Sequence, residues 1–359
     1  MSRASMARKY AGIAGAAIGV VAAGAAAGIF AERKLVARRR EAAAVPFGSL
    51  RGERRTVTAD DGLALYVEID EAEAGPSNRN INTPKPTLVF THGYALNLDC
   101  WHFQRAALRG DYRMVFYDHR SHGRSARSRP EHCTIDQLGR DLSAVLDEVV
   151  PDGPAVLIGH SMGGMTIMAL AEQQPELLGT RIAGAGFIST SAGGLQASTL
   201  GLPGMPGRLL QRLSPAVMAT LARAPRLVDS GRRVGSDFGY VVTRKLAFGT
   251  EVPQEYVDFT DEMLAATPFD VVADFFPGFD THDKYSALAA LSTVPVVVIA
   301  GGRDAITPCS HSRRLAERIS SAELVEFPEA GHMVIFECRD EVTKALRQLI
   351  ERALSGEQP

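Results

Sequence analysis

The stretch that decides the fold runs from residue 155 to 171 and reads AVLIGHSMGGMTIMALA. An uninterrupted apolar run over 155–158 is typical of a buried strand, and residues 165–171 are typical of a helix. Between them stands Gly159-His160-Ser161-Met162-Gly163, a G-x-S-x-G pattern whose small residues permit a sharp turn around the serine. We predict that this turn presents the Ser161 hydroxyl at the end of a strand, beside a helix N-terminus that favours negative charge.

Two more polar residues follow strand-like runs further along the chain. Asp304 comes just after the apolar run 294–300, and His332 follows the run 323–327. A serine hydroxyl needs a histidine to take its proton, and that histidine needs a carboxylate to fix its tautomer. The sequence therefore predicts a catalytic triad of Ser161, Asp304 and His332. Asp283 is a rival for the acid, but it follows no clear strand.

With these motifs the chain resembles the α/β-hydrolase superfamily, and within it serine esterases and monoacylglycerol-lipase-like enzymes. The resemblance covers the chain from about Arg54 to its end. It also rests on Thr91-His92-Gly93-Tyr94 and on Asp118-His119-Arg120-Ser121-His122-Gly123-Arg124-Ser125, where Ser121 replaces a glycine common in relatives.

The resemblance also implies an oxyanion hole. In the family, backbone N–H groups from the residue after His-Gly and from the residue after the nucleophile hold the oxyanion. Those positions are Tyr94 and Met162 in this chain.

Alternating strand and helix signals predict an α/β protein with the α/β-hydrolase fold: a mostly parallel sheet, helices on both faces and a helical cap. A helical pattern is clear over 135–149. The predicted strands are short runs near residues 63–69, 87–91, 114–117, 156–159, 184–188, 296–300 and 323–327.

The alternation stops between residues 191 and 285, where the chain is helical and apolar and where relatives insert a lid. We therefore predict a helical cap over 191–285. At the start of the chain we predict an N-terminal membrane anchor or signal region over 1–45. The core comprises 46–190 and 286–359. Met and Phe side chains in the cap favour an apolar acyl chain in the substrate.

The 359-residue chain has a net charge of −2, which gives no reason to expect nucleic acid as a partner. We expect no cofactor, because no phosphate-binding glycine loop is present, and no metal, because the histidines and the four cysteines lack ligand spacing. The expected partner is a small-molecule ester or lipid substrate. The oligomeric state is left open.

The N-terminal segment 11–31 carries no charge and is long enough to span a bilayer as a helix of roughly 30 Å. It predicts either a transmembrane anchor or a signal peptide cleaved near Ala25-Ala26-Ala27. Basic residues are denser after the segment than before it. We therefore expect a membrane-anchored protein with a cytoplasmic catalytic domain, and export is the alternative.

Together, these patterns predict a serine-nucleophile hydrolase of carboxylic esters, either esterase- or lipase-like. On the same fold, a thioesterase, a C–C bond hydrolase or a perhydrolase remains open. A non-catalytic ligand-binding protein is the alternative from a different class, although such proteins often lose a member of the triad.

Overall fold

The computed structural model describes residues 45–73, 85–150, 153–195 and 243–355. The chain divides into two units, Met1–Pro46 and Phe47–Pro359, and every described helix and strand belongs to the second. The predicted segment 11–31 and residues 196–242 of the predicted cap lie outside the described residues.

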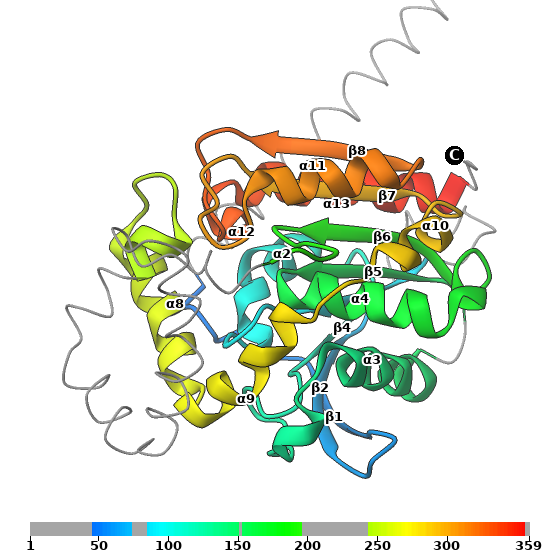
Figure 1. Cartoon of the computed structure of the whole chain (residues 1–359), viewed down its shortest axis with the longest axis horizontal. Helices are drawn as coiled ribbons and strands as arrows, with labels where there is room; N and C mark the ends of the chain where they lie inside the picture. The colour runs from blue at the N-terminus through cyan, green and yellow to red at the C-terminus, as the bar shows by residue number, and fades with distance from the viewer. Residues whose placement is uncertain (1–44, 74–84, 151–152, 196–242, 356–359) are drawn as a thin grey trace, which may run out of the picture. The chain divides into compact units, whose positions relative to one another are not determined.

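The centre of the second unit is a sheet of eight strands in the order β1-β2-β4-β3-β5-β6-β7-β8 (Figure 1). The strands from β4 to β8 pair in parallel, and β1 and β2 add two antiparallel pairings at one edge. Their bounds are Glu53–Thr58, Ala64–Asp70, Thr87–Thr91, Met114–Tyr117, Ala155–His160, Ile182–Ile188, Val296–Gly301 and Ala322–Phe327, for β1 to β8. The prediction of a mostly parallel α/β sheet is confirmed.

Helices cover both faces of the sheet because successive side chains of each central strand point to opposite sides. In β5, Leu157 joins one buried cluster with α3 and α4, whereas Val156 and Ile158 join the other with α2 and α13. The helices are α2 His102–Leu108, α3 Ile135–Val149, α4 Met162–Gln173, α8 Gln254–Ala266, α9 Phe269–Asp280, α10 Leu288–Leu291, α11 Cys309–Arg318, α12 Val334–Glu337 and α13 Arg339–Ser355.

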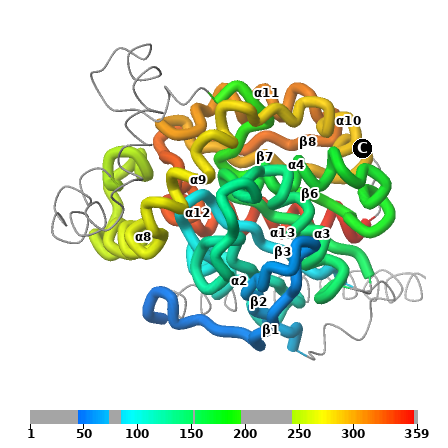
Figure 2. Tube along the Cα trace, turned by 60° about the horizontal axis from the view of Figure 1, so that its bottom comes forward, coloured from blue at the N-terminus to red at the C-terminus, as the bar shows by residue number. Residues whose placement is uncertain are grey.

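Helices α8 and α9 of the predicted cap fall among the described residues. Figure 1 shows α8 and α9, in yellow, at the end of the sheet to which the arrows of the parallel strands point, and Figure 2 shows the two helices next to each other. The apolar face of α9 packs through Val271, Phe275 and Phe279 against Met162 and Tyr94. The division of this unit into a core and a separate cap remains a prediction.

The edge strand β1 was not predicted from the sequence. Its six residues are ERRTVT, and all but Val57 are exposed. A strand that buries almost no side chains lacks the apolar alternation that marks a strand in a sequence. Pairing with β2, from Glu53 opposite Ile69 to Thr58 opposite Ala64, makes it a strand.

The prediction of a membrane-anchored protein is wrong. Within residues 45–73, 85–150, 153–195 and 243–355, no helix is both long and apolar enough to cross a bilayer. The longest helix of those ranges, α13, has 17 residues and carries Arg339, Asp340 and Glu341 at its start.

A buried ion pair fixes the loop that follows β4. Arg120 donates two hydrogen bonds to Asp141 of α3, from Nε at 2.7 Å and Nη2 at 2.6 Å, and two to Asp61, from Nη1 at 2.8 Å and Nη2 at 3.2 Å. Both Arg120 and Asp141 are fully buried. Burial alone would lower the pKa of Arg120, but the hydrogen bonds and charges of the two carboxylates outweigh it and raise that pKa.

We expect Arg120→Ala to lower the free energy of unfolding by about 3–5 kcal/mol, because it leaves the buried Asp141 carboxylate without its cation. Urea titration measures the loss. Arg313→Ala is the matched control, since Arg313 pairs with Glu326 through the same two-bond geometry, 2.7 Å and 2.7 Å, at the surface. Equal losses for the two variants would contradict a special role for the buried pair.

Candidate active site

The carboxyl edge of the parallel strands concentrates the backbone strain of the described chain. Four non-glycine residues there have positive φ, and each follows a different central strand: Ala95 (57°) after β3, Ser121 (65°) after β4, Ser161 (53°) after β5 and Ser189 (46°) after β6. Such angles persist only where the surrounding structure enforces them, and they are common at active sites. The strain therefore marks this edge as the candidate site.

Ser161 lies at the sharp turn between β5 and α4, as the sequence predicts. Its amide donates to the carbonyl of Ile188 at 2.9 Å, and its carbonyl accepts from Thr190 Oγ1 at 2.7 Å. A Cβ at Gly163 would lie 2.1 Å from the carbonyl oxygen of Thr91, and one at Gly159 would lie 2.5 Å from the Gly163 carbonyl carbon. The small residues of the motif are required because backbone segments touch there.

Asp304 and His332 come together after β7 and β8. His332 Nδ1 donates to Asp304 Oδ2 at 2.8 Å, and the Asp304 carboxylate also accepts from the amides of Ile306 and Thr307, both at 2.8 Å. Burial alone would raise the pKa of Asp304, but the adjacent His332 and the donors of Thr307 outweigh it and hold that pKa below its ordinary value. Asp304 therefore stays ionised beside the histidine.

Thr307 is a member of this group that the sequence reasoning missed. Its Oγ1 donates to Asp304 Oδ2 at 2.8 Å and lies 3.3 Å from His332 Nδ1. The hydroxyl fixes the carboxylate that holds the histidine. The sequence signal, a threonine three residues after Asp304, is too common to single it out.

His160 connects the serine turn to the His332 loop. It precedes Ser161 directly, its Nε2–H donates to the His332 carbonyl at 3.0 Å, and the two rings have centroids 4.8 Å apart. Burial lowers the pKa of His160 to about 3, and the neighbouring His332 adds to that effect. His160 is therefore neutral, and its hydrogen bond joins the turn that carries Ser161 to the loop that carries His332.

The rival acid Asp283 has another role. Its Oδ1 accepts a hydrogen bond from the amide of Tyr285 at 3.2 Å, and its backbone forms a β-bridge with Gly193. These contacts cap the turn at the end of the predicted lid, whereas Asp304 holds the hydrogen bond to His332.

The residues predicted for the oxyanion hole follow β3 and β5. Tyr94 lies within the loop between β3 and the 3-10 helix that begins at Leu98, and Met162 is the first residue of α4, where an N–H has no acceptor within its own helix. The Tyr94 hydroxyl donates to the Val272 carbonyl of α9, and its ring meets Phe279 edge-on at 4.9 Å. Tyr94 thus joins the candidate site to α9 of the predicted cap.

Three buried histidines support the loops next to this site. His92 Nε2 accepts from the amide of His119 at 2.9 Å, so its proton is on Nδ1, which donates to the Gly93 carbonyl at 2.8 Å. His122 Nε2 accepts from the Ala95 amide at 3.2 Å. The rings of His92 and His119 have centroids 4.4 Å apart.

Burial keeps these three rings neutral. It lowers the pKa of His119 to about 3 and that of His122 to about 4, and it holds the pKa of His92 well below its ordinary value, where the two neighbouring rings contribute. Neutral rings of this kind fit a structural role for His92, His119 and His122 in holding the loops beside the candidate site.

Ser121 stands at a position where the family pattern has glycine. The backbone conformation at this position explains that preference. Its φ of 65° lies in the left-handed region that glycine adopts without strain. In this chain the Ser121 Oγ accepts a hydrogen bond from the Ser128 amide at 2.9 Å, which ties the loop together.

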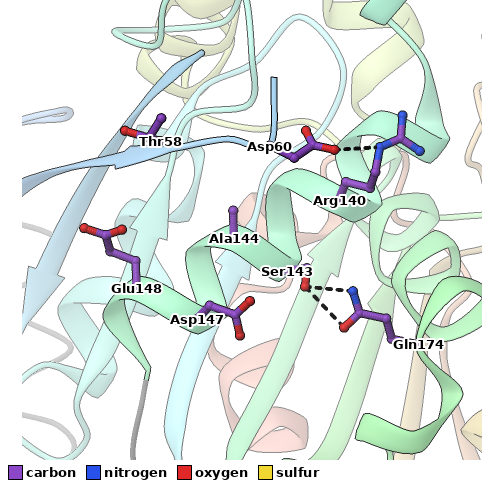
Figure 3. A pocket seen from close by; sticks show the side chains of 8 residues that line it. All are labelled: Thr58, Asp60, Arg140, Ser143, Ala144, Asp147, Glu148 and Gln174. Carbon is purple, nitrogen blue, oxygen red and sulfur yellow. Dashed lines mark hydrogen bonds and ion pairs between the residues drawn. The ribbon is translucent and has the colours of Figure 1, made fainter. Parts of the chain in front are cut away.

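An open surface pocket of about 470 Å³ lies elsewhere, between the end of β1 and α3 (Figure 3). None of the predicted site residues lines it; its lining is Thr58, Asp60, Arg140, Ser143, Ala144, Asp147, Glu148 and Gln174. Within the described part of the chain, no group of three or more His, Cys, Asp or Glu side chains is arranged to hold a metal ion.

The sequence and the fold of this chain were both compared with those of known proteins. A family model described as "Alpha/beta hydrolase family" matches residues 88–345. The 3-oxoadipate enol-lactonase 2 of Acinetobacter baylyi is 26% identical over 301 residues, which are 83% of this chain and 96% of the relative.

Two further likenesses are more limited. The dihydrolipoyllysine-residue acetyltransferase component of the acetoin cleaving system of Pseudomonas putida is 28% identical over 74% of this chain, and the match spans only 63% of that relative's length. A thermophilic esterase from Thermogutta terrifontis has a TM-score of 0.64 at 23% identity, with 84% of this chain and 100% of the other covered, which shows a common fold.

Proposed function

Because this chain belongs to the α/β-hydrolase family, and because His332 and Asp304 are hydrogen bonded at the strand edge that carries Ser161, we propose that it is a serine-nucleophile hydrolase of carboxylic esters. The observation that carries the proposal is the 2.8 Å bond between His332 Nδ1 and Asp304 Oδ2. It leaves the other nitrogen of the His332 ring without a proton and able to act as a base.

In the proposed reaction, Ser161 Oγ attacks the carbonyl carbon of the ester while His332 Nε2 takes the hydroxyl proton. Asp304 stabilises the imidazolium that forms. The C–O bond to the alcohol then breaks, and His332 returns the proton to the leaving oxygen. A water molecule, deprotonated by His332, hydrolyses the acyl-enzyme and releases the acid.

The negative charge that develops on the carbonyl oxygen needs donors that are already in place. The proposed donors are the backbone N–H groups of Tyr94 and Met162. The N-terminal position of Met162 in α4 adds the favourable end of the helix dipole.

The proposed substrate carries an apolar acyl chain. Supporting this, Met162 and Tyr94 pack against the apolar face of α9. The phenylalanines of α9 differ: Phe275 is buried and packs against His122 at 5.2 Å, whereas Phe276 is only partly buried. Phe276 is therefore the residue at which a substitution tests substrate preference without opening the core.

A panel of p-nitrophenyl esters from acetate to palmitate, with one lactone and one thioester, tests the proposal. We expect hydrolysis of the esters, absent in Ser161→Ala. A lactone is included because it is a cyclic ester, the class named in the enol-lactonase relative.

For the acyl chain, we expect Phe276→Asp to lower kcat/KM more for long esters than for acetate, since each methylene contact is worth roughly 0.8 kcal/mol. Cleavage of the thioester but of none of the oxygen esters would contradict the ester proposal and indicate a thioesterase. An equal loss of kcat/KM at all chain lengths would contradict a role of the cap in binding the acyl chain.

A further inference from the structure

The carboxylate of Glu337, the last residue of α12, is surrounded by donors from two loops. Oε1 accepts from the Gly331 amide at 2.6 Å, and Oε2 accepts from the Thr250 amide at 2.7 Å and the Thr250 hydroxyl at 2.6 Å. The Gly249 amide approaches both oxygens, at 3.2 and 3.1 Å. One side chain therefore satisfies three backbone N–H groups and a hydroxyl.

The two loops that Glu337 joins are those on which the candidate site depends. Gly331 directly precedes His332, and residues 247–250 lead into α8 of the cap. The backbones touch: a Cβ at Gly249 would lie 2.6 Å from the Gly331 nitrogen, and the Met333 amide donates to the Ala247 carbonyl at 2.8 Å.

We propose that Glu337 is the positioning residue for His332: it holds the Gly331 amide, and with it the histidine loop, in register with Asp304 and with the entry to α8. This inference rests on the proposed function, in which His332 is the base. Glu337 itself touches no reacting atom and acts only through the loop.

The requirement is for two accepting oxygens. Glutamine has the same size and shape as glutamate, but it has one oxygen and one NH₂ group. Whichever way the amide turns, its NH₂ group faces backbone N–H donors, either that of Gly331 or that of Thr250. Aspartate keeps both oxygens on a shorter stem and is the conservative variant.

We expect Glu337→Gln to lower kcat about 10- to 100-fold with KM little changed, because a displacement of about 1 Å at the base slows the chemical step. Glu337→Asp should retain more activity than Glu337→Gln. Rates are normalised to the fraction of Ser161 that a fluorophosphonate probe labels at end point, so that misfolded protein does not count.

Glu329→Gln is the matched control, since Glu329 lies on the same loop but is exposed and pairs with Arg303. Its kcat should stay within about twofold of the parent, as expected for an exposed ion pair. A normalised kcat of Glu337→Gln equal to that of this control would overturn the inference, whatever the change in melting temperature.

A crystal structure of Glu337→Gln gives a readout that needs no ester. We expect Gly331 to shift and the 2.8 Å bond between His332 Nδ1 and Asp304 Oδ2 to lengthen. An unchanged bond and an unshifted Gly331 would overturn the positioning role. If the bond lengthens while the parent hydrolyses no ester, the positioning role survives and the proposed function fails.

Discussion

Replacing Asp304 by asparagine is expected to lower kcat for ester hydrolysis by about 10⁴, the magnitude typical of a triad acid. The carboxylate accepts from His332 Nδ1 and from Thr307 Oγ1 at the same oxygen, both at 2.8 Å. An amide NH₂ at that place would face the His332 N–H and favour the wrong tautomer. Ser161→Ala should lose activity by several orders of magnitude, because the nucleophile itself is gone.

Asp283→Asn is the control for the acid, since Asp283 was the alternative in the sequence and caps a turn in the structure. It should leave kcat within about twofold of the parent. A fluorophosphonate probe followed by mass spectrometry should identify Ser161 as the labelled serine. Labelling of a different serine, or full activity in Ser161→Ala, would disprove the proposed mechanism.

Stability is expected to fall steeply as the pH is lowered from about 6.5 towards 4. Burial lowers the folded-state pKa of His119 and His160 to about 3 and of His122 to about 4, and that of His92 lies well below its ordinary value. The unfolded chain takes up these protons near pH 6.5 and the folded chain does not, so acid favours unfolding.

Three carboxyls whose pKa burial raises oppose this trend: Asp118, Asp141 and Asp274. Burial raises the pKa of Asp118 to about 6, so between pH 6 and its ordinary value the folded chain binds a proton that the unfolded chain lacks. The pKa values of His282 and His311 are lowered as well, so the histidines outnumber the opposing carboxyls. The free energy of unfolding is therefore expected to fall with pH by about 1.4 kcal/mol per pH unit for each net proton that only the unfolded chain binds.

Urea unfolding at pH 7.5, 6.5 and 5.5 measures this slope. His119→Gln should reduce this slope by roughly one proton, because it removes one of the buried rings whose pKa the fold lowers. A free energy of unfolding that stays level or rises between pH 6.5 and 5.5 would show that the buried histidines are not held neutral by the fold.

Much of the fold follows from local pattern. Helix α3 begins and ends at the predicted residues, Ile135 and Val149, because its apolar positions recur at helical spacing and Thr134 caps its first turn. The buried strands β3 and β4 also have their predicted bounds. Strand β1 escaped prediction because it is held by pairing with β2 rather than by burial.

The sequence by itself determined the chemistry that this chain can offer: a serine in a strand–turn–helix motif, then an aspartate and a histidine after later strands. These signals are local, since each depends on a short apolar run and the residue that follows it. The assignment of triad roles to Ser161, Asp304 and His332 remains a proposal.

Only the tertiary structure decided how these groups are held. The Thr307 hydroxyl on Asp304 and the Glu337 carboxylate on Gly331 depend on side chains meeting loops. The same holds for Phe275, which packs in the core while its neighbour Phe276 stays partly exposed. Contacts between segments distant in the chain depend on strand order and helix packing, and neither composition nor periodicity encodes them residue by residue.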